Sequence, residues 1–223
     1  MSMEHYFTPH QTSAPKTKAI SETLLGNYLT FTTISGTFSK GRVDPGTKLL
    51  IESCTMKDGW KALDFGCGYG AVGIAIAKAY PQAEMAMVDT NERALGASRM
   101  NAQANGAGNA RVTPEWKENN YFDCVLLYPP FHAGKKVCFG MIEQAKKFLK
   151  VDGVLQVVAR HNKGGSSMKL WMEEVFGNAE DIAKKSGYRV YLSRKEEEKL
   201  KKINKKEPSL IKTNSCLLVD VIK

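Results

Sequence analysis

The segment most suggestive of chemistry is 63–70, where an acidic residue is followed by three glycines at alternate positions. The apolar residues before it are typical of a strand, and the Ala-rich segment 71–77 after it is typical of a buried helix. A strand, a glycine turn and a helix in this order begin the nucleotide-binding unit of α/β proteins. The segment holds five candidate cofactor-binding residues: Asp64, Gly66, Cys67, Gly68 and Gly70.

Asp64 discriminates between two classes of cofactor. Residues 66–71 also fit the dinucleotide fingerprint, which places a pyrophosphate at the helix N-terminus, where N–H groups and the helix dipole favour an anion. A carboxylate at the mouth of that site would repel the pyrophosphate. S-adenosylmethionine carries a sulfonium and an ammonium instead, so Asp64 favours this cationic cofactor.

A second acidic candidate, Asp89, ends the next strand-like run, 85–88. This is about where α/β proteins place the acceptor for ribose hydroxyls, ~20 residues beyond the glycine loop. A purely structural alternative is that Asp64 caps the first helix and Asp89 caps a helix that begins near Asn91. Their joint spacing around the three glycines favours the cofactor interpretation.

The segment 64–70 resembles the first motif of class I S-adenosylmethionine-dependent methyltransferases. Residues 31–50 resemble the lead-in of the methyltransferase small domain family, which includes the small-subunit ribosomal RNA guanine-N2 methyltransferases and their archaeal relatives. Three further segments match the second motif, the fourth motif and the closing strand of that family: 89–95, 128–135 and 187–190. The resemblance covers roughly residues 4–195.

The resemblance places the reaction at four residues that follow a buried strand: Tyr128, Pro129, Pro130 and Phe131. In the family, an Asn or Asp before the two prolines accepts a hydrogen bond from the target amino group, and the adjacent backbone carbonyl accepts another. The aromatic residue after the prolines stacks on the base, a common mode of recognising unpaired RNA bases. Positioning of this kind can supply most of the catalysis.

Tyr128 stands where the family usually has Asn, and this is the main departure of the chain from the family pattern. A phenol can accept a hydrogen bond, but it is longer than an amide. The target amine could be positioned by the backbone alone, the nucleophile could differ, or the protein could bind cofactor without turnover. A structural alternative is that Tyr128 is a core aromatic residue at a strand end, followed by a stiff turn.

Two weaker candidates for the adenine part of the cofactor come from the resemblance. Glu115 follows a short strand, where the family often places an acidic residue on the adenine amino group, and Thr90 borders the same region. Thr90 could equally be a turn residue before a helix. His132 could accept a proton, because an ordinary His has a pKa near neutral. No cluster of His and Cys suggests a metal site.

Composition is typical of a globular protein that works in a reducing compartment. The chain has 223 residues, of which 43% are hydrophobic and 25% charged, and the five cysteines form no C-x-x-C pair. Disulfides and zinc are therefore disfavoured, and a cytoplasmic location is expected. No apolar run approaches the ~18 residues of a membrane span, and the N-terminal residues do not have the pattern of a signal peptide, so we expect neither. Whether the protein is a monomer or a homodimer is left open.

The formal charge of +9 favours a polyanionic partner, and nucleic acid is the expected substrate class. Basic residues follow predicted strand ends or lie on neighbouring helices: Lys135, Lys136, Lys146, Lys147, Lys150, Arg160 and Lys163. The lysine-rich segment 195–206 also has acidic residues at helical spacing, so a solvated helix explains it.

The expected fold is α/β: a doubly wound, mostly parallel seven-stranded sheet with an antiparallel edge strand. Residues 1–43 are predicted to be an irregular segment and a hairpin (28–33 with 36–42) packed on the core. Residues 44–194 form the methyltransferase core, in which Asp44-Pro45 begins a helix that ends near Cys54. Residues 195–223 add the basic helix and a last strand, 216–222.

These observations predict a methyltransferase that moves a methyl group from S-adenosylmethionine to a base of RNA, namely N2 of a guanine in ribosomal RNA. Two alternatives stay open. The enzyme could act on a protein amide or a small molecule, since a Pro-Pro-aromatic motif also serves such targets. The chain could also be a cofactor- and RNA-binding module without turnover.

Overall fold

The computed structural model describes residues 16–35 and 41–197. Its centre is a seven-stranded sheet in the order β5-β4-β3-β6-β7-β9-β8, which confirms the predicted fold class. The strands are β3 (Lys61–Phe65), β4 (Glu84–Val88), β5 (Ala110–Thr113), β6 (Phe122–Leu127), β7 (Leu149–Arg160), β8 (Glu180–Lys185) and β9 (Tyr188–Arg194).

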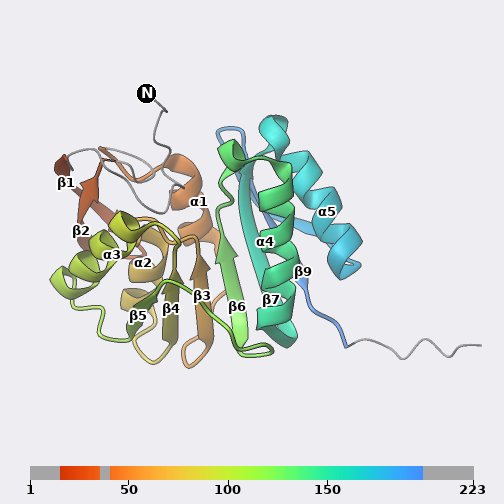
Figure 1. Cartoon of the computed structure of the whole chain (residues 1–223), viewed down its shortest axis with the longest axis horizontal. Helices are drawn as coiled ribbons and strands as arrows, with labels where there is room; N and C mark the ends of the chain where they lie inside the picture. Colours follow the sequence, from red (N-terminus) through yellow and green to blue (C-terminus); the bar gives the residue numbers. More distant parts are fainter. Residues whose placement is uncertain (1–15, 36–40, 198–223) are drawn as a thin grey trace, which may run out of the picture.

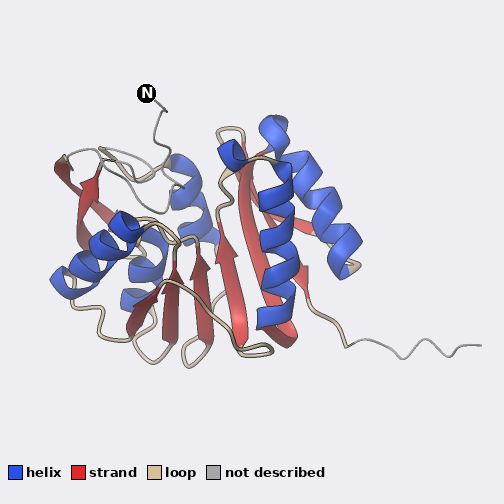
Figure 2. Cartoon of the chain, in the orientation of Figure 1, coloured by secondary structure: helices blue, strands red, loops and turns tan. Residues whose placement is uncertain are grey.

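Of these seven strands, β9 alone runs in the opposite direction to the others: it pairs antiparallel with β7 and with the edge strand β8, while β3 to β7 are parallel to one another. The chain order reverses between β3 and β6, so this is the switch point of the sheet. Ligands of open α/β sheets bind beyond the carboxyl ends of the strands at such a point. Figure 2 shows the arrowheads of β3, β4 and β6 along this one edge.

Helices cover both faces of the sheet. Helices α1 (Pro45–Ser53), α2 (Ala71–Ala79) and α3 (Glu92–Ala104) contribute to the core on one face. Helices α4 (Lys135–Phe148) and α5 (Ser166–Phe176) pack on the other, and Figure 1 shows α4 running along β7. The short helices η1 (Phe131–Ala133) and η2 (His161–Gly165) follow β6 and β7.

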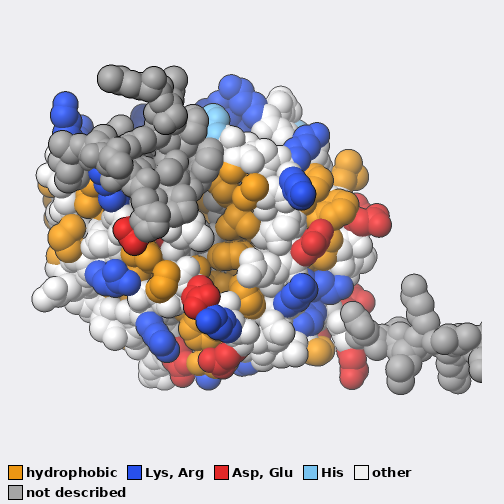
Figure 3. Space-filling model, in the orientation of Figure 1, with side chains coloured by type: hydrophobic (Ala, Val, Ile, Leu, Met, Phe, Trp, Pro, Cys, Tyr) orange, Lys and Arg blue, Asp and Glu red, His pale blue; other side chains and the backbone are white. Residues whose placement is uncertain are grey.

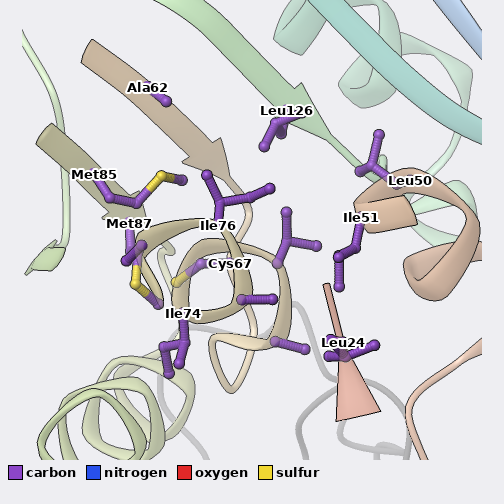
Figure 4. Packing of buried hydrophobic residues seen from close by; sticks show 14 of the residues in the cluster. Leu24, Leu50, Ile51, Ala62, Cys67, Ile74, Ile76, Met85, Met87 and Leu126 are labelled. Carbon is purple, nitrogen blue, oxygen red and sulfur yellow. The ribbon is translucent and has the colours of Figure 1, made fainter. Parts of the chain in front are cut away.

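The packing of α2 on β4 holds the glycine turn in place. Ile74 and Ile76 of α2 and Met87 of β4 have no exposed surface, and Met85 has 1%. Figure 4 shows these four side chains close together in the core around α2. Full burial of a side chain of this size contributes roughly 1.5–3 kcal/mol. The apolar run that predicted the helix therefore also fixes the position of the loop before it.

The N-terminal hairpin differs from the prediction. It consists of β1 (Thr17–Leu24) and β2 (Asn27–Ile34), so the strand that pairs with the predicted strand 28–33 precedes it in the chain. Of the predicted partner 36–42, residues 36–40 lie outside the described residues. Residues 17–24 look polar because only one face of the strand is buried, with Ile20 and Leu24 pointing inward. Leu25 and Gly26 both have positive φ, 47° and 78°, as a tight hairpin turn requires.

Two asparagines of α3 fasten the hairpin. The side-chain amide of Asn101 accepts a hydrogen bond from Thr32 N (2.8 Å) and donates one to Thr32 O (3.0 Å). It thus satisfies the two backbone groups of Thr32 that a neighbouring strand would otherwise bind. Asn105 makes the same pair of bonds with Thr30, at 3.0 and 2.8 Å. Asn101 also donates to the carbonyl of Tyr69 (2.8 Å), and this bond ties the hairpin to the glycine loop.

The predicted basic helix does not begin at Lys195. Residues 195–197 are not helical, and Lys195 instead continues the sheet edge by donating its N–H to Gly153 O (2.9 Å) and accepting from Asp152 N (2.7 Å). The rest of that segment and the predicted strand 216–222 lie outside the described residues. Within the described part of the chain, no helix has the length and apolar character needed to cross a membrane.

Candidate active site

A cavity of about 480 Å³ lies at the switch point, beyond the carboxyl ends of β3, β4 and β6. It is lined by nine of the predicted site residues: Asp64, Gly66, Cys67, Gly68, Asp89, Thr90, Tyr128, Pro129 and Pro130. Gly70, Glu115 and Phe131 are not among the lining residues. Apolar side chains complete the wall, among them Val88, Val137 and Met141.

The glycine loop is shaped by backbone hydrogen bonds to β4. The N–H groups of Gly66 and Cys67 both donate to the carbonyl of Val88, at 2.8 and 2.9 Å. Gly66, Gly68 and Gly70 have positive φ of 86°, 57° and 95°, which L side chains rarely adopt. A Cβ on Gly70 would also lie 2.7 Å from a methyl group of Met87. Gly70 therefore lets the loop pack directly against Met87 of β4, where a larger residue would not fit.

Asp64 is a buried carboxylate, with only 4% of its surface exposed. Its Oδ2 accepts a hydrogen bond from the N–H of Gly73 at 2.9 Å, in the first turn of α2. Burial, with a smaller contribution from the charge of Asp89, raises the pKa of Asp64 to about 7, while the Gly73 N–H opposes the rise. The ionised form of Asp64 is costly in the protein without a cation beside it.

Gly73 is a supporting residue that the sequence motifs did not reveal. A Cβ at this position would lie 2.6 Å from Cγ and 2.8 Å from the sulfur of Met87, and 3.2 Å from Oδ2 of Asp64. Only glycine lets α2 approach β4 this closely and present its N–H to the carboxylate. The available signal was a glycine inside an otherwise apolar, Ala-rich helix.

Asp89 organises the other side of the loop. Its Oδ2 accepts from the N–H of Gly68 and its Oδ1 from the N–H of Asn91, both at 2.9 Å. Burial raises the pKa of Asp89 above its usual range, and these hydrogen bonds oppose the rise. Among the described residues, no Lys, Arg or His forms an ion pair with Asp64 or Asp89.

Neither acidic residue is the helix cap that the structural alternative required. The N-cap of α2 is Gly70, which makes no side-chain capping bond. The N-cap of α3 is Asn91, whose side chain accepts from the N–H groups of Arg93 and Ala94. Asp64 accepts its hydrogen bond from Gly73, the third residue of α2, and Asp89 lies two residues before Asn91. Both residues line the cavity instead.

Ser98 is a second supporting residue that was not predicted. It is fully buried on α3 and donates its hydroxyl to the carbonyl of Gly68 at 2.8 Å. The sulfur of Cys67 lies 3.5 Å from the same hydroxyl. A buried Ser on an amphipathic helix has no distinctive sequence signal, because its partner is a backbone carbonyl far away in the chain.

The opposite wall of the cavity is the segment after β6. Tyr128 is half-buried there; it lines the cavity and also packs against the core. The next residues turn tightly: Phe131 N donates to Pro129 O at 3.0 Å, and Ala133 N donates to Pro130 O at 2.8 Å. The turn carries Phe131 away from the cavity wall and toward Gly164 of η2, where a Cβ would lie 3.3 Å from the ring.

Glu115 is exposed, and its carboxylate forms an ion pair with Lys117 at 2.8 Å. Thr90 is also exposed but does line the cavity. The structure therefore brings Thr90 to the site and leaves Glu115 outside its wall. The residues after the short strand β5 were the least constrained part of the family resemblance, since Pro114 interrupts them.

The structure divides the predicted basic residues into two groups. Lys135, Lys136, Arg160 and Lys163 are exposed in the segments after β6 and β7, at the edge that holds the cavity. Figure 3 shows Lys, Arg and His side chains gathered at the top of the drawn face, above hydrophobic side chains.

The second group lies at the other end of α4 and has local partners. Lys146 donates to the carbonyl of Val175 at 2.7 Å, and Lys150 pairs with Asp123 at 2.8 Å. Lys147, in the same last turn, is exposed. Only the first group is placed to meet a substrate of the cavity.

The model of the methyltransferase small domain matches residues 28–192. The Bacillus subtilis protein YbxB is 34% identical over 198 residues, covering 86% of this chain and 98% of its own length. A Shewanella denitrificans protein named ribosomal RNA small subunit methyltransferase C is 30% identical over 201 residues, covering 86% of this chain and 54% of its own.

Among solved structures, the T. Thermophilus 16S rRNA guanine-N2 methyltransferase in complex with AdoMet and guanosine has a TM-score of 0.70 and 27% identity. The match covers 80% of this chain and 50% of that one. The chain thus spans about half the length of the ribosomal RNA methyltransferases that it matches.

Proposed function

This chain belongs to the methyltransferase small domain family, and we propose that it transfers a methyl group from S-adenosylmethionine to N2 of a guanine in small-subunit ribosomal RNA. The names of its relatives support the RNA substrate, and guanosine in the T. Thermophilus structure supports the base. The exposed basic residues around the cavity, Lys135, Lys136, Arg160 and Lys163, support a polyanionic partner.

The cavity fits the cofactor. Its volume of about 480 Å³ is that of a site for one organic ligand, and two carboxylates without an ion-pair partner in the described chain face it. Asp64 would bind the cationic methionine part, and Asp89 would accept hydrogen bonds from the ribose. The backbone of Gly66 to Gly68 would lie along the ligand. When bound, S-adenosylmethionine supplies an electrophilic methyl group on its sulfonium.

The opposite wall would position the nucleophile. The exocyclic amine of guanine is weakly nucleophilic because its lone pair is delocalised into the ring, so its orientation matters. Tyr128 would accept a hydrogen bond from the amine, while Pro129 and Pro130 hold the backbone rigid. The apolar side chains of Val88 and Met141 also line the cavity and would limit the access of water to it. Phe131 would contact the base at the outer rim.

One observation carries the proposal: a single cavity is lined both by Asp64 and Asp89, two carboxylates without an ion-pair partner in the described chain, and by the Tyr128–Pro130 segment. This arrangement suits a sulfonium donor opposite a positioned acceptor. Of the alternative targets, nothing in the site favours a protein amide or a small molecule over a nucleobase.

The test is methyl transfer from radiolabelled S-adenosylmethionine to small-subunit RNA from a strain lacking the protein. The RNA is then digested and the nucleosides are separated by chromatography and mass spectrometry. We expect label in N2-methylguanosine with the wild-type protein and far less with Asp64→Asn at the same cofactor concentration. Label in another nucleoside would refute the assigned atom. Binding of the cofactor without labelling of any RNA would refute the activity.

A further inference from the structure

Tyr128 joins a polar cluster behind the cavity wall, which we call the Asp44 cluster: Asp44, Tyr128, Tyr188 and Arg160. Its members come from four separate elements, the N-cap of α1 and the ends of β6, β9 and β7. Of the four, only Tyr128 lines the cavity. The cluster therefore links the proposed target-binding residue to groups that the sequence motifs do not include.

The two oxygens of Asp44 have different partners. Oδ2 caps α1 by accepting from the N–H groups of Gly46 and Thr47, at 2.7 and 3.3 Å. Oδ1 accepts from the hydroxyl of Tyr188, at 3.4 Å. Helix capping uses Oδ2, and Oδ1 is directed toward the hydroxyl of Tyr188.

Tyr188 is fitted tightly into this arrangement. It is 5% exposed, and a Cβ on Gly46 would lie 2.8 Å from its ring, so the ring packs directly on the first turn of α1. Its ring meets that of Tyr128 edge to face, with centroids 6.5 Å apart. The guanidinium of Arg160 lies over the Tyr188 ring, 4.9 Å from its centroid. This packing leaves the two phenols little freedom to move.

We propose that Asp44 is a positioning residue that, together with Tyr188, holds the Tyr128 hydroxyl beside the target amine, so that the phenol serves where the family uses an amide. The inference rests on the proposed function and deepens it. A phenol that donates its proton to a carboxylate keeps its oxygen lone pairs for an incoming N–H donor. In this arrangement the amine donates to Tyr128, and Tyr128 donates to Asp44.

The electrostatics of the cluster agree with these roles. Burial, the charge of Asp44 and hydrogen bonding to Tyr188 and Asp44 together raise the pKa of Tyr128 well above its usual range. Tyr128 is therefore a neutral phenol at physiological pH. A neutral phenol can both donate to a carboxylate and accept from an amine, whereas a phenolate could only accept.

Asp44→Asn separates the positioning role from helix capping. Asn caps helices about as well as Asp, so α1 should keep its first turn, while the charge that orients Tyr128 is lost. A hydrogen bond to a charged group is typically worth ~10- to 100-fold in an equilibrium or rate. We expect kcat to fall about tenfold or more for Asp44→Asn, with the KM for S-adenosylmethionine unchanged.

Asp58→Asn is the matched control. Asp58 is an exposed aspartate that accepts a hydrogen bond from the N–H of Gln82 at 2.8 Å, ahead of β3 at the opposite edge of the sheet. The charge change is the same, and kcat should not change. A kcat of Asp44→Asn within twofold of wild type would overturn the inference.

A double-mutant cycle tests whether Asp44 acts through the hydroxyl. In a Tyr128→Phe background, Asp44→Asn should have no further effect on kcat, because the group that it orients is gone. The same cycle is measured by denaturant unfolding without any substrate, where the two substitutions should again be non-additive. Additive unfolding effects would overturn this inference alone. Failure of the wild-type protein to label RNA, with non-additive unfolding, would instead overturn the proposed function.

Discussion

Carboxylates at the amino edge of the sheet, where the parallel strands begin, have different partners from those at the carboxyl edge, where these strands end. At the amino edge, Asp123 accepts from the N–H of Lys61 and forms an ion pair with Lys150 at 2.8 Å, and Glu84 lies 3.5 Å from the ammonium of Lys61. At the carboxyl edge, Asp64 and Asp89 accept hydrogen bonds from backbone N–H groups and have no cationic partner within the described chain.

This difference separates carboxylates that are paired with cations of the fold from carboxylates that we propose to bind a ligand. Partly exposed ion pairs such as Lys150–Asp123 contribute about 0–1 kcal/mol to the free energy of unfolding, and both charges belong to the chain itself. A buried carboxylate without a cation reduces stability and is usually found where a ligand supplies the missing charge. The largest effects on cofactor binding should therefore come from the carboxyl edge, and those at the amino edge should be confined to stability.

Asp64→Asn tests the carboxyl edge most directly, and the largest effect is expected there. The amide can still accept from the N–H of Gly73, but it cannot neutralise a cation, so we expect the affinity for S-adenosylmethionine to fall about 100-fold. The unliganded variant should be at least as stable as wild type at pH 8, because it no longer buries a charge. Calorimetric titration and denaturant unfolding measure the two quantities.

Asp123→Asn is the matched substitution at the amino edge. It should lower the free energy of unfolding by at most about 1 kcal/mol and leave cofactor affinity unchanged. Opposite signs of the stability change at the two edges are the expected signature. A loss of cofactor affinity in Asp123→Asn equal to that in Asp64→Asn would show that the two edges do not differ in function.

Gly73→Ala tests the support beneath Asp64. The new methyl group would overlap Met87, so the helix must shift, which should cost about 1–3 kcal/mol of unfolding free energy and weaken cofactor binding. Gly96→Ala in α3 is the control, because a Cβ there meets no atom within 4 Å. It should stabilise the protein by about 0.4–1 kcal/mol. Equal effects of the two substitutions would contradict the close approach of α2 to β4.

The comparison also shows which parts of the site the sequence could predict. The strand, glycine turn and helix around Asp64 are local, so motif spacing located them correctly, and the burial of α2 followed from its apolar run. Gly73, Ser98 and Asp44 act through contacts with residues distant in the chain, such as Met87 and Tyr188, and no local pattern encodes such contacts. The hairpin was misplaced for a related reason: β1 buries only one face and looks polar.

The pH dependence of cofactor binding should report Asp64 directly. Because the folded-state pKa is raised from 3.8 to about 7, the protonated form predominates below pH 7 and cannot pair with a cation. At pH 6 about one molecule in ten is ionised, so affinity should be about tenfold weaker than well above pH 7. The raised pKa of Asp89 acts in the same direction.

The raised pKa of Asp64 also makes the stability of the unliganded protein depend on pH. Between pH 3.8 and about 7 the folded state binds more protons than the unfolded state at Asp64, so the contribution of this residue to stability falls as pH rises through that window. Thermal unfolding with and without S-adenosylhomocysteine from pH 5.5 to 7.5 checks both effects. The ligand-induced rise in Tm should grow with pH, and this growth should be smaller in Asp64→Asn, where only Asp89 still contributes to it. A pH-independent rise in wild type would contradict the assignment.

The smallest expected effect concerns the lysines of the two edges. Lys135 and Lys136 are exposed beside the cavity, whereas Lys57 and Lys147 are exposed at the opposite end of the strands and helices. If RNA approaches the carboxyl edge, Lys135→Ala with Lys136→Ala should weaken RNA binding. The slope of log affinity against log salt should become shallower by roughly 0.7 for each single-strand phosphate that the variant no longer neutralises.

The control is Lys57→Ala with Lys147→Ala. This double variant removes the same charge, so a change due to net charge alone would appear equally in both pairs. Fluorescence anisotropy with a small-subunit RNA fragment at several salt concentrations distinguishes the outcomes. Equal slopes in the two double variants would mean that RNA does not bind preferentially at the edge where Asp64 and Tyr128 face the cavity.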